Sequence, residues 1–449
     1  MTACNREPLT FPRLGTKAVV ADFHGGQLTT DAGALLLRQV ERHLGLFDAL
    51  DAAIPDPRRP ELIEHDQKAM LAQRITAIAL GYEDLNDHHT LRADPAMQVV
   101  AGGDPAPTAP LASPSTLCRL ENRVDRDASA RIAAVLVEQF IASHAEPPEA
   151  LILDFDATDD PVHGKQEGRF FHGYYDHHCF LPLYVFCGDE LLVAYLRPSN
   201  IDAAKHSRAL LKLLVRRLRA AWPGVKVTIR ADSGFCRWRL MRWCDRNGVG
   251  YVLGIARNRT LERLAVDGTE RARLRFERTG QPQRLFGSFA YAAGSWDRPR
   301  RLIVKAEHTA QGPNPRFVVT NVPGDPQQLY DEVYCQRGEA ENRIKEQQLD
   351  LFADRTSCHR FAANQFRLLL SSAAYLLVQA LRRTALAGTE LAQAQVGTIR
   401  LKLLKVAARV AVSVRRVVFH LASSYPYQGL FERVSERLMG CVVRASSSG

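Results

Sequence analysis

The spacing of hydrophobic residues changes along the chain and divides it into segments of different secondary structure. In the first part, apolar positions recur three to four residues apart, which predicts helices over about 30–50, 61–81 and 113–144. The first of these helices is marked by Leu35, Leu36, Val40, Leu44 and Phe47. Residues 1–146 are therefore expected to form a mainly helical N-terminal domain.

Strand patterns begin after the pair Pro147-Pro148. Apolar runs predict a meander of three strands, then a helix, a parallel strand, a second helix and a further strand. These elements are expected at 150–156, 180–186, 190–196, 202–221, 225–232, 237–247 and 251–255. The order is that of a ribonuclease-H-like α/β core, which we expect over residues 147–257 and, after an interruption, 326–390.

The interruption, residues 258–325, reads as short strands between turn-rich loops. The strands are expected at Ser288–Ala292, Arg301–Ala306 and Arg316–Asn321. We therefore predict a β-rich insertion within the α/β core. The remaining residues, 391–449, form a basic C-terminal segment, in which alternating apolar positions from 399 to 414 favour a hairpin over a helix.

Two acidic residues stand at the ends of predicted buried strands. Asp156 closes the run from Leu151, and Asp232 closes the run from Val225 and is followed by Ser-Gly-Phe. Side chains alternate along a strand, so Asp154 points to the same face as Asp156 and either could serve at a site. An aspartate at a strand end is also a common turn residue, and that structural reading stays open for each of them.

A third acidic residue, Glu341, lies on a predicted helix. Tyr334, Arg337, Glu341, Lys345 and Gln348 are spaced so that all five share one helical face. A solvent-exposed ladder of salt bridges would explain the charged residues but not the tyrosine. Two carboxylates on strands and one on a helix can converge on a pair of hard cations, which clamp the attacking and leaving oxygens of a phosphodiester.

The charge balance agrees with a polyanionic partner such as double-stranded DNA. The net charge is +10 and the pI is about 9.2. The N-terminus lacks the layout of a signal peptide, and we find no apolar run of 18 residues, so we expect a cytoplasmic protein without a membrane partner. The nine cysteines form no CxxC pair, which argues against a zinc ribbon and for reduced thiols.

At three points the chain resembles the DDE transposases of bacterial insertion sequences, in the branch with the motif Tyr-x2-Arg-x3-Glu-x6-Lys. The matching segments are Asp156-Ala-Thr158, Asp232-Ser-Gly-Phe235 and Tyr334-x2-Arg337-x3-Glu341. More narrowly, it resembles the thirteen-eighty group, through Thr30–Leu37, Leu153–Thr158, Gly164-Lys-Gln166, Arg230–Phe235 and Ser424–Tyr427. Gln348 stands where the branch has its final lysine, and Lys345, one turn earlier, could take its place.

The resemblance implies an enzyme that cuts and joins DNA at insertion-sequence ends. Asp156, Asp232 and Glu341 would hold two Mg²⁺ or Mn²⁺ ions, and Tyr334 and Arg337 would position the 5′ phosphate near the cut. Transposon ends would be read by the N-terminal DNA-binding domain and by basic C-terminal residues, and target DNA would join them on a homodimer. The residues expected to contact DNA are Lys345, Arg119, Arg123, Arg400, Lys402, Arg415 and Arg416.

Two other functions remain open from the sequence. One is a ribonuclease-H-like nuclease or resolvase that cuts DNA without strand transfer, and the other is a DNA-binding relative without catalysis. Among the remaining aromatic residues, Tyr174 and Tyr175 are expected in the core. Trp296 lies where related enzymes hold a pocket for a flipped base, but a packing role is favoured.

Overall fold

The computed structural model describes residues 7–105 and 109–446, which fall into two compact units. One unit comprises the chain up to Asp51, Asp56–Leu120 and the chain from Ala380 onward. The other comprises Ala52–Pro55 and Glu121–Gln379. The N-terminal and C-terminal parts of the chain therefore fold together, and the helix α7, Arg126–Ala142, belongs to the second unit and not with the helices before it.

In the first unit, short helices surround the long buried helix α3, Gln67–Leu80, which ends at Gly81 in the left-handed conformation. A C-terminal hairpin is present, but it lies later than the predicted 399–414: its strand β16 pairs with both β17 and the early strand β3, and the helix α15 follows it. Residues 396–404 are helical and not part of that hairpin. The bounds are β1 Leu9–Leu14, β2 Lys17–Ala21, β3 Gln27–Thr29, α1 Ala34–Leu44, α2 Leu46–Ala53, α5 Pro95–Val100, α14 Val396–Ile399, β16 Ala408–Ser413, β17 Arg416–Leu421 and α15 Gln428–Ser446.

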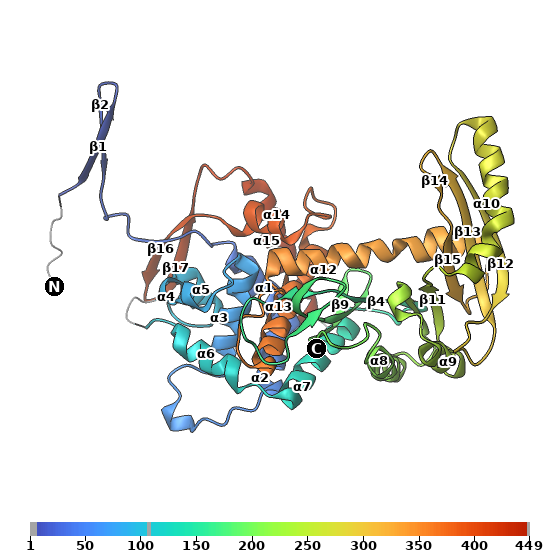
Figure 1. Ribbon diagram of the computed structural model, residues 1–449. Helices are drawn as coiled ribbons and strands as arrows, with labels where there is room; N and C mark the ends of the chain where they lie inside the picture. The colour runs from blue at the N-terminus through green and yellow to red at the C-terminus, as the bar shows by residue number, and fades with distance from the viewer. Residues whose placement is uncertain (1–6, 106–108, 447–449) are drawn as a thin grey trace. The chain divides into compact units, whose positions relative to one another are not determined.

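A nine-stranded mixed sheet forms the centre of the second unit (Figure 1). Its strand order is β12-β13-β15-β11-β10-β4-β8-β9, with β14 beside β13. The strand β4, which comes first in the chain among these, is parallel to β10 and antiparallel to β8, and β10 is parallel to β11. The bounds are β4 Ala150–Ala157, β8 Leu183–Cys187, β9 Glu190–Tyr195, β10 Lys226–Ala231, β11 Gly250–Gly254, β12 Gln283–Tyr291, β13 Arg300–Thr309, β14 Gly312–Pro313 and β15 Arg316–Thr320.

Alternation along the strands gives the sheet two different faces. Leu151, Leu153 and Phe155 of β4 join one large core with residues of four helices, α7, α8 Ser207–Ala221, α9 Trp238–Arg246 and α10 Arg259–Thr279. On the opposite face a smaller core gathers Val252, Ile303 and Val318 against the segment that leads into α12, Gly338–Leu351. Asp154 and Asp156 alternate with the large-core residues and therefore belong to this second face.

The predicted insertion differs from expectation in two ways. Its strands β12, β13 and β15 do not stand apart but continue the main sheet, because β15 pairs with both β11 and β13. It also contains the 21-residue helix α10, which the sequence pattern did not reveal. The side of α10 that packs on the sheet consists mostly of small residues: a Cβ at Gly268 would lie 2.9 Å from that of Ala306 on β13. A helix that packs through glycine and alanine shows little hydrophobic periodicity.

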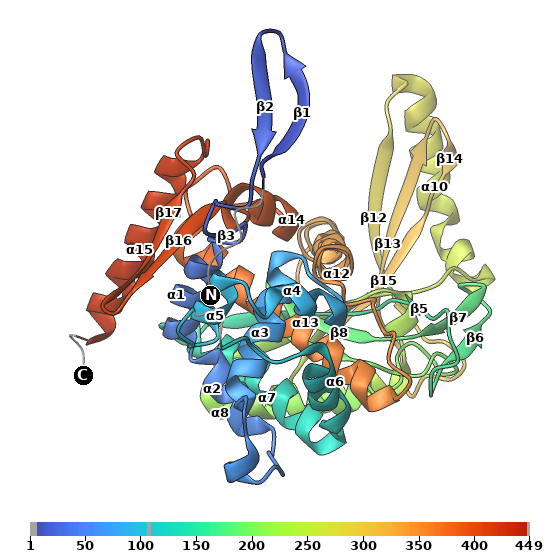
Figure 2. The ribbon, with the colours of Figure 1, turned by 90° about the vertical axis from the view of Figure 1, so that its left-hand side faces the viewer.

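Two further features of the fold are a small second sheet and a long apolar helix. A small sheet of β5 Asp160–Pro161, β7 His177–Phe180 and β6 Phe170–His172 follows β4 directly, and Figure 2 shows its three strands side by side. The helix Phe361–Leu386 is long and apolar enough to cross a membrane by length and composition, but 83% of its most apolar window is buried inside the structure. Its apolar residues are thus those of a core helix.

Candidate active site

Strand β4 carries two aspartates on the face away from the large core, and their surroundings differ. Asp154 is buried, and both of its oxygens accept hydrogen bonds from the guanidinium of Arg230 on β10, with Nη2 2.7 Å from Oδ2. The two residues are direct partners in the sheet register. Arg230 also donates to the carbonyl of Val333 at 2.6 Å. Asp154 is therefore fully engaged in a structural ion pair.

Asp156 has no such bidentate partner and lies two residues further along β4, nearer the carboxyl end of the strand. Its Oδ1 accepts the backbone N–H of Ala157 at 2.8 Å, and its Oδ2 lies 3.8 Å from Nη1 of Arg337. Burial raises the pKa of Asp156 to about 7, and the negative charges of Asp232 and Glu341 add to the rise. The Ala157 hydrogen bond and Arg337 only partly offset it. Asp156 therefore lies where another positive charge would be stabilised.

Asp232 follows β10, the strand that runs parallel to β4. Because the carboxyl ends of parallel strands meet at one edge of a sheet, Asp232 and Asp156 are brought to the same edge. The Oδ1 atom of Asp232 accepts the N–H of Gly234 at 2.9 Å, which caps the short turn Ser233–Phe235. The turn role that the sequence left open is real, and it leaves the Oδ2 atom free for other contacts.

The third acidic residue comes from the helix face. Arg337, ahead of α12, donates through Nη1 to Glu341 Oε1, and the same nitrogen faces Asp156. The Arg337–Glu341 contact is the i,i+4 pair that a solvent-exposed ladder would contain. It is not such a ladder, since Arg337 also reaches a strand residue more than 180 positions earlier in the chain. One guanidinium thus lies between two of the three carboxylates.

Tyr334 lies close to the end of β11, where a glycine makes room for it. A Cβ at Gly254 would overlap the Tyr334 hydroxyl and lie 3.1 Å from the backbone nitrogen of Ser233, next to Asp232. Burial raises the pKa of Tyr334, and Asp232 raises it further while Arg337 opposes the rise. The sequence analysis missed Gly254, although an isolated glycine in a strand pattern is a known sign of close backbone approach.

Gln348 has a different role from the one its position suggested. Its side-chain nitrogen donates to Asp160 Oδ1 at 2.9 Å and to the carbonyl of Asp159 at 3.2 Å. Asp160 is fully buried, and burial raises the pKa of its carboxyl group well above the usual range. Gln348 therefore joins the Glu341 helix to the segment that follows Asp156. Lys345, one turn earlier, is exposed.

The other residues expected to contact DNA belong to elements that carry none of the three carboxylates. Arg119 is exposed and Arg123 half-buried on α6, Pro114–Arg123, an element that carries none of the three acids. Arg400 donates from Nε to the carbonyl of Ala79 at 2.9 Å, so it serves the packing of its own unit. The turn between β16 and β17 leaves Arg415 and Arg416 exposed, and Lys402 lies over the ring of Tyr427.

The three carboxylates share one electrostatic neighbourhood, but they are not gathered around a single point. Within residues 7–105 and 109–446, no three His, Cys, Asp or Glu side chains are arranged to hold a metal ion as they stand. Like charges repel in the absence of a cation, and Arg337 separates two of them. The donor set itself, carboxylate oxygens alone, suits hard divalent cations. The raised pKa of Asp156 marks the charge that such a cation would stabilise.

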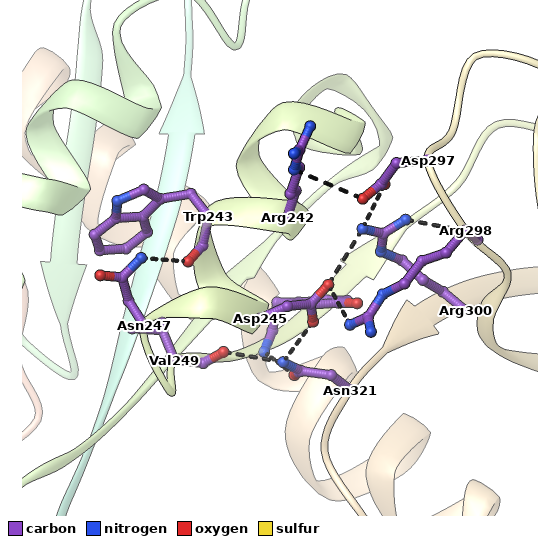
Figure 3. A network of polar contacts seen from close by, with 10 residues as sticks. Arg242, Trp243, Asp245, Asn247, Val249, Asp297, Arg298, Arg300 and Asn321 are labelled. Atoms are coloured by element: carbon purple, nitrogen blue, oxygen red, sulfur yellow. Dashed lines mark hydrogen bonds and ion pairs between the residues drawn. The ribbon is translucent and has the colours of Figure 1, made fainter.

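Trp296 proves to be a packing residue. Its ring meets that of Tyr291 edge-on at 5.4 Å and lies 5.7 Å from the guanidinium carbon of Arg300. Arg300 belongs to a network in which Asp245 and Asp297 bind several arginines and Asn321 (Figure 3). The network ties α9 to β13 and to the end of β15. It thereby anchors the added strands to the α/β core.

A family comparison places this α/β protein among the DDE transposases. The family model, transposase DDE domain group 1, matches residues 11–442, a range that includes Asp156, Asp232 and Glu341. The chain belongs to this family and is a DNA transposase. DDE transposases generally use divalent metal ions.

Two further comparisons were made with individual proteins. No curated protein matches the chain. Among solved structures, it is similar to a cryo-EM structure of the piggyBac transposase synaptic complex with hairpin DNA. The identity is 9% and the TM-score 0.43, over 83% of this chain and 80% of that chain.

Proposed function

We propose that this transposase cuts and joins DNA at the ends of a bacterial insertion sequence, with Asp156, Asp232 and Glu341 as its metal-binding residues. The observation that carries the proposal is the position of Asp156. It lies half-buried at the carboxyl end of β4, burial and the charges of the other two carboxylates raise its pKa, and its Oδ2 lies 3.8 Å from the guanidinium of Arg337. Perturbed carboxylates of this kind are typical of catalytic sites.

The choice of Asp156 over Asp154 rests on their partners. Asp154 already forms a bidentate ion pair with Arg230. If Asp154 bound a metal instead, the buried guanidinium of Arg230 would be left without a counter-charge. Asp156 can bind a metal through Oδ2 without breaking any contact of the sheet.

The order of the strands supports a ribonuclease-H-like core. Strands β9, β8, β4, β10 and β11 are adjacent in that order. The central strand, β4, is the one of these five that comes first in the chain. This order brings the ends of β4 and β10 together and lets α12 contact β4 with its Glu341 turn close by. The added strands β15, β13 and β12 lie beyond β11, on the far side from β8 and β9.

The donor set fits two Mg²⁺ or Mn²⁺ ions, which would activate the attacking hydroxyl and stabilise the leaving oxygen of the phosphodiester. Asp156, Asp232 and Glu341 would hold them. Arg337 would then exchange its carboxylate partners for phosphate oxygens, which its planar guanidinium can bind in pairs. Tyr334, whose hydroxyl packs against Gly254 at the end of β11, would orient the same phosphate. Lys345, which is exposed on the same helix, would contact the DNA backbone.

The remaining parts of the proposal concern assembly. Transposon ends and target DNA would be bound as double strands, with Arg119, Arg123 and the exposed Arg415 and Arg416 as contacts. Joining two ends requires two active sites, so a homodimer on paired ends is proposed. The site of action would be the cytoplasm, where bacterial DNA is found.

The test uses purified protein, Mg²⁺ and a DNA end with a pre-cleaved 3′-hydroxyl. Wild-type protein should join that end to target DNA, and Asp156→Asn should abolish joining and cleavage while DNA binding is retained. Glu341→Gln should do the same, whereas Glu339→Gln, an exposed neighbour on the same helix, should not. Cleavage without joining would favour the nuclease, and binding without either reaction the non-catalytic relative. Loss of activity in Asp154→Asn alone would transfer the metal role to Asp154.

A further inference from the structure

A hairpin with exposed aromatic rings follows the first acidic residue of the site. It consists of β6, the turn 173–176 and β7, and we call residues 170–178 the aromatic hairpin. Its strand β7 pairs with β5, which begins four residues after Asp156 (Figure 2). The hairpin is therefore built onto the segment that directly follows β4, the strand of Asp156.

Several rings of the hairpin are exposed, and Tyr174 is not in the core as expected. Tyr174 is 86% exposed, Phe171 55% and Phe170 42%. Tyr175 is half-buried, and its ring lies 5.0 Å from that of Tyr174 and 4.9 Å from that of His172. Three large rings are thus exposed to solvent on one short hairpin, and exposed apolar side chains concentrated in this way indicate a binding site.

Several contacts hold the hairpin in place. His177 Nε2 lies 2.8 Å from Asp159 Oδ2, and Ser199 Oγ donates to the carbonyl of Phe170 at 2.9 Å. At the turn, the N–H of Asp176 donates to the carbonyl of His172, and Asp176 adopts a left-handed conformation with φ of 58°. The rings therefore project from a defined scaffold close to the site, and little ordering is needed when they bind a partner.

The position of the hairpin indicates what the partner is. Asp159, which binds His177, is three residues from Asp156, and burial together with the charges of Asp159 and Asp156 raises the pKa of Tyr175 to about 12. A molecule that contacts Tyr174, whose ring lies 5.0 Å from that of Tyr175, would thus lie close to the phosphate that the site would process. The exposed Lys165 precedes the hairpin and adds positive charge, which suits a nucleic acid.

We propose that the aromatic hairpin stacks on DNA bases beside the cut, with Tyr174, its most exposed ring, as the platform. Every base has a π face, so stacking on these rings needs no particular sequence. The contact would stabilise bases that leave the duplex stack near the scissile phosphate. This inference rests on the proposed function, because it concerns the DNA on which that site acts.

The test compares cleavage of two DNA ends, one fully paired and one with mismatched bases flanking the cut. Tyr174→Ala should slow cleavage of the paired end about tenfold or more, and the mismatched end should recover most of the loss, because its bases are already unstacked. Tyr174→Trp and Tyr174→Phe should retain activity, whereas Tyr174→Leu, apolar but without a ring, should not. Phe289→Ala removes an exposed ring from β12 and serves as the control, with no expected effect.

Each other outcome overturns the inference in a recognisable way. Equal losses on both DNA ends, or full activity of Tyr174→Leu, would show that stacking is not the role of the ring. A loss that follows the oligomeric state of Tyr174→Ala would assign the hairpin to contacts between copies of the chain. Normal cleavage by Tyr174→Ala would remove the hairpin alone, whereas an inactive wild type would remove the proposed function and this inference with it.

Discussion

Replacing Asp156 by asparagine should stabilise the metal-free protein at neutral and alkaline pH. Asparagine has nearly the same shape, and its side-chain oxygen can still accept the N–H of Ala157. What it lacks is the negative charge that burial, Asp232 and Glu341 all disfavour. A residue required for activity would thus be one whose removal improves stability, as expected where a site stores electrostatic repulsion for its ligand.

The structure sets the size and the pH dependence of this effect. The pKa of Asp156 rises from 3.8 to about 7 on folding. Between these values the folded protein holds a proton that the unfolded chain has released, so stability falls as pH rises through this window. At about 1.36 kcal/mol for each pH unit, the full cost is at most about 4 kcal/mol and is reached above pH 7. Asp156→Asn should avoid this cost.

Thermal unfolding without divalent metal, measured at pH 5 and pH 8, provides the assay. The midpoint of Asp156→Asn should exceed that of wild type by several degrees at pH 8 and by much less at pH 5. Adding Mg²⁺ should raise the midpoint of wild type and not that of the variant, because the metal binds the folded site. Urea unfolding at the same pH values provides an independent measure.

Asp154→Asn is the matched control, because it changes a carboxyl group two residues away on the same strand face. It should destabilise the protein by about 3–5 kcal/mol at pH 8, since it leaves the buried Arg230 without a counter-charge. Opposite signs for the two variants would support the assignment of charges. If Asp156→Asn is destabilising at pH 8, or its advantage does not grow with pH, then the three carboxylates do not share one site as argued.

Three further predictions follow from the same geometry. Arg337→Ala should reduce the rate of cleavage or joining far more than DNA affinity, since a displaced phosphate costs orders of magnitude in rate; near-normal turnover would return Arg337 to a surface ion pair worth under about 1 kcal/mol. Gly254→Ala should reduce activity by displacing the Tyr334 hydroxyl, and adding Tyr334→Phe to this variant should recover part of its lost stability. If the two substitutions instead changed the free energy of unfolding additively, the contact between the two residues would be contradicted. In a DNA titration, the logarithm of the binding constant should fall linearly with the logarithm of the salt concentration, with a slope of about −0.9 for each phosphate neutralised. An affinity that does not change with salt would exclude a phosphate-dominated interface.

The strand order and the meeting of Asp156 with Asp232 could be anticipated from the sequence because both depend on local patterns. Buried strands are marked by their apolar runs, and parallel strands bring their carboxyl ends to one edge. The helix face of Glu341 is likewise a matter of spacing alone. These features need no knowledge of which distant segments pack together.

What could not be anticipated depends on contacts between distant residues. Gln348 binds Asp160, which lies 188 positions earlier, so its part in holding the helix is not visible in either segment. The helix α10 packs through Gly268 and two alanines, and its pattern therefore resembles that of a charged loop. Tyr174 looked like a core residue because tyrosine is usually half-buried, but its place on a hairpin turn leaves it in solvent.

A buried ion pair next to the candidate site links the segments that carry the three carboxylates. Arg230 lies on β10, two residues before Asp232; it binds Asp154 on β4, two residues before Asp156; and it donates to Val333, directly before Tyr334. One buried guanidinium thus joins the three segments that carry the site. Asp154 precedes Asp156, and Arg230 precedes Asp232, by two positions, so the pair lies beside the candidate carboxylates on the same face of the sheet. In the proposed function, this buried ion pair would fix the distances between the segments that hold the metal-binding residues.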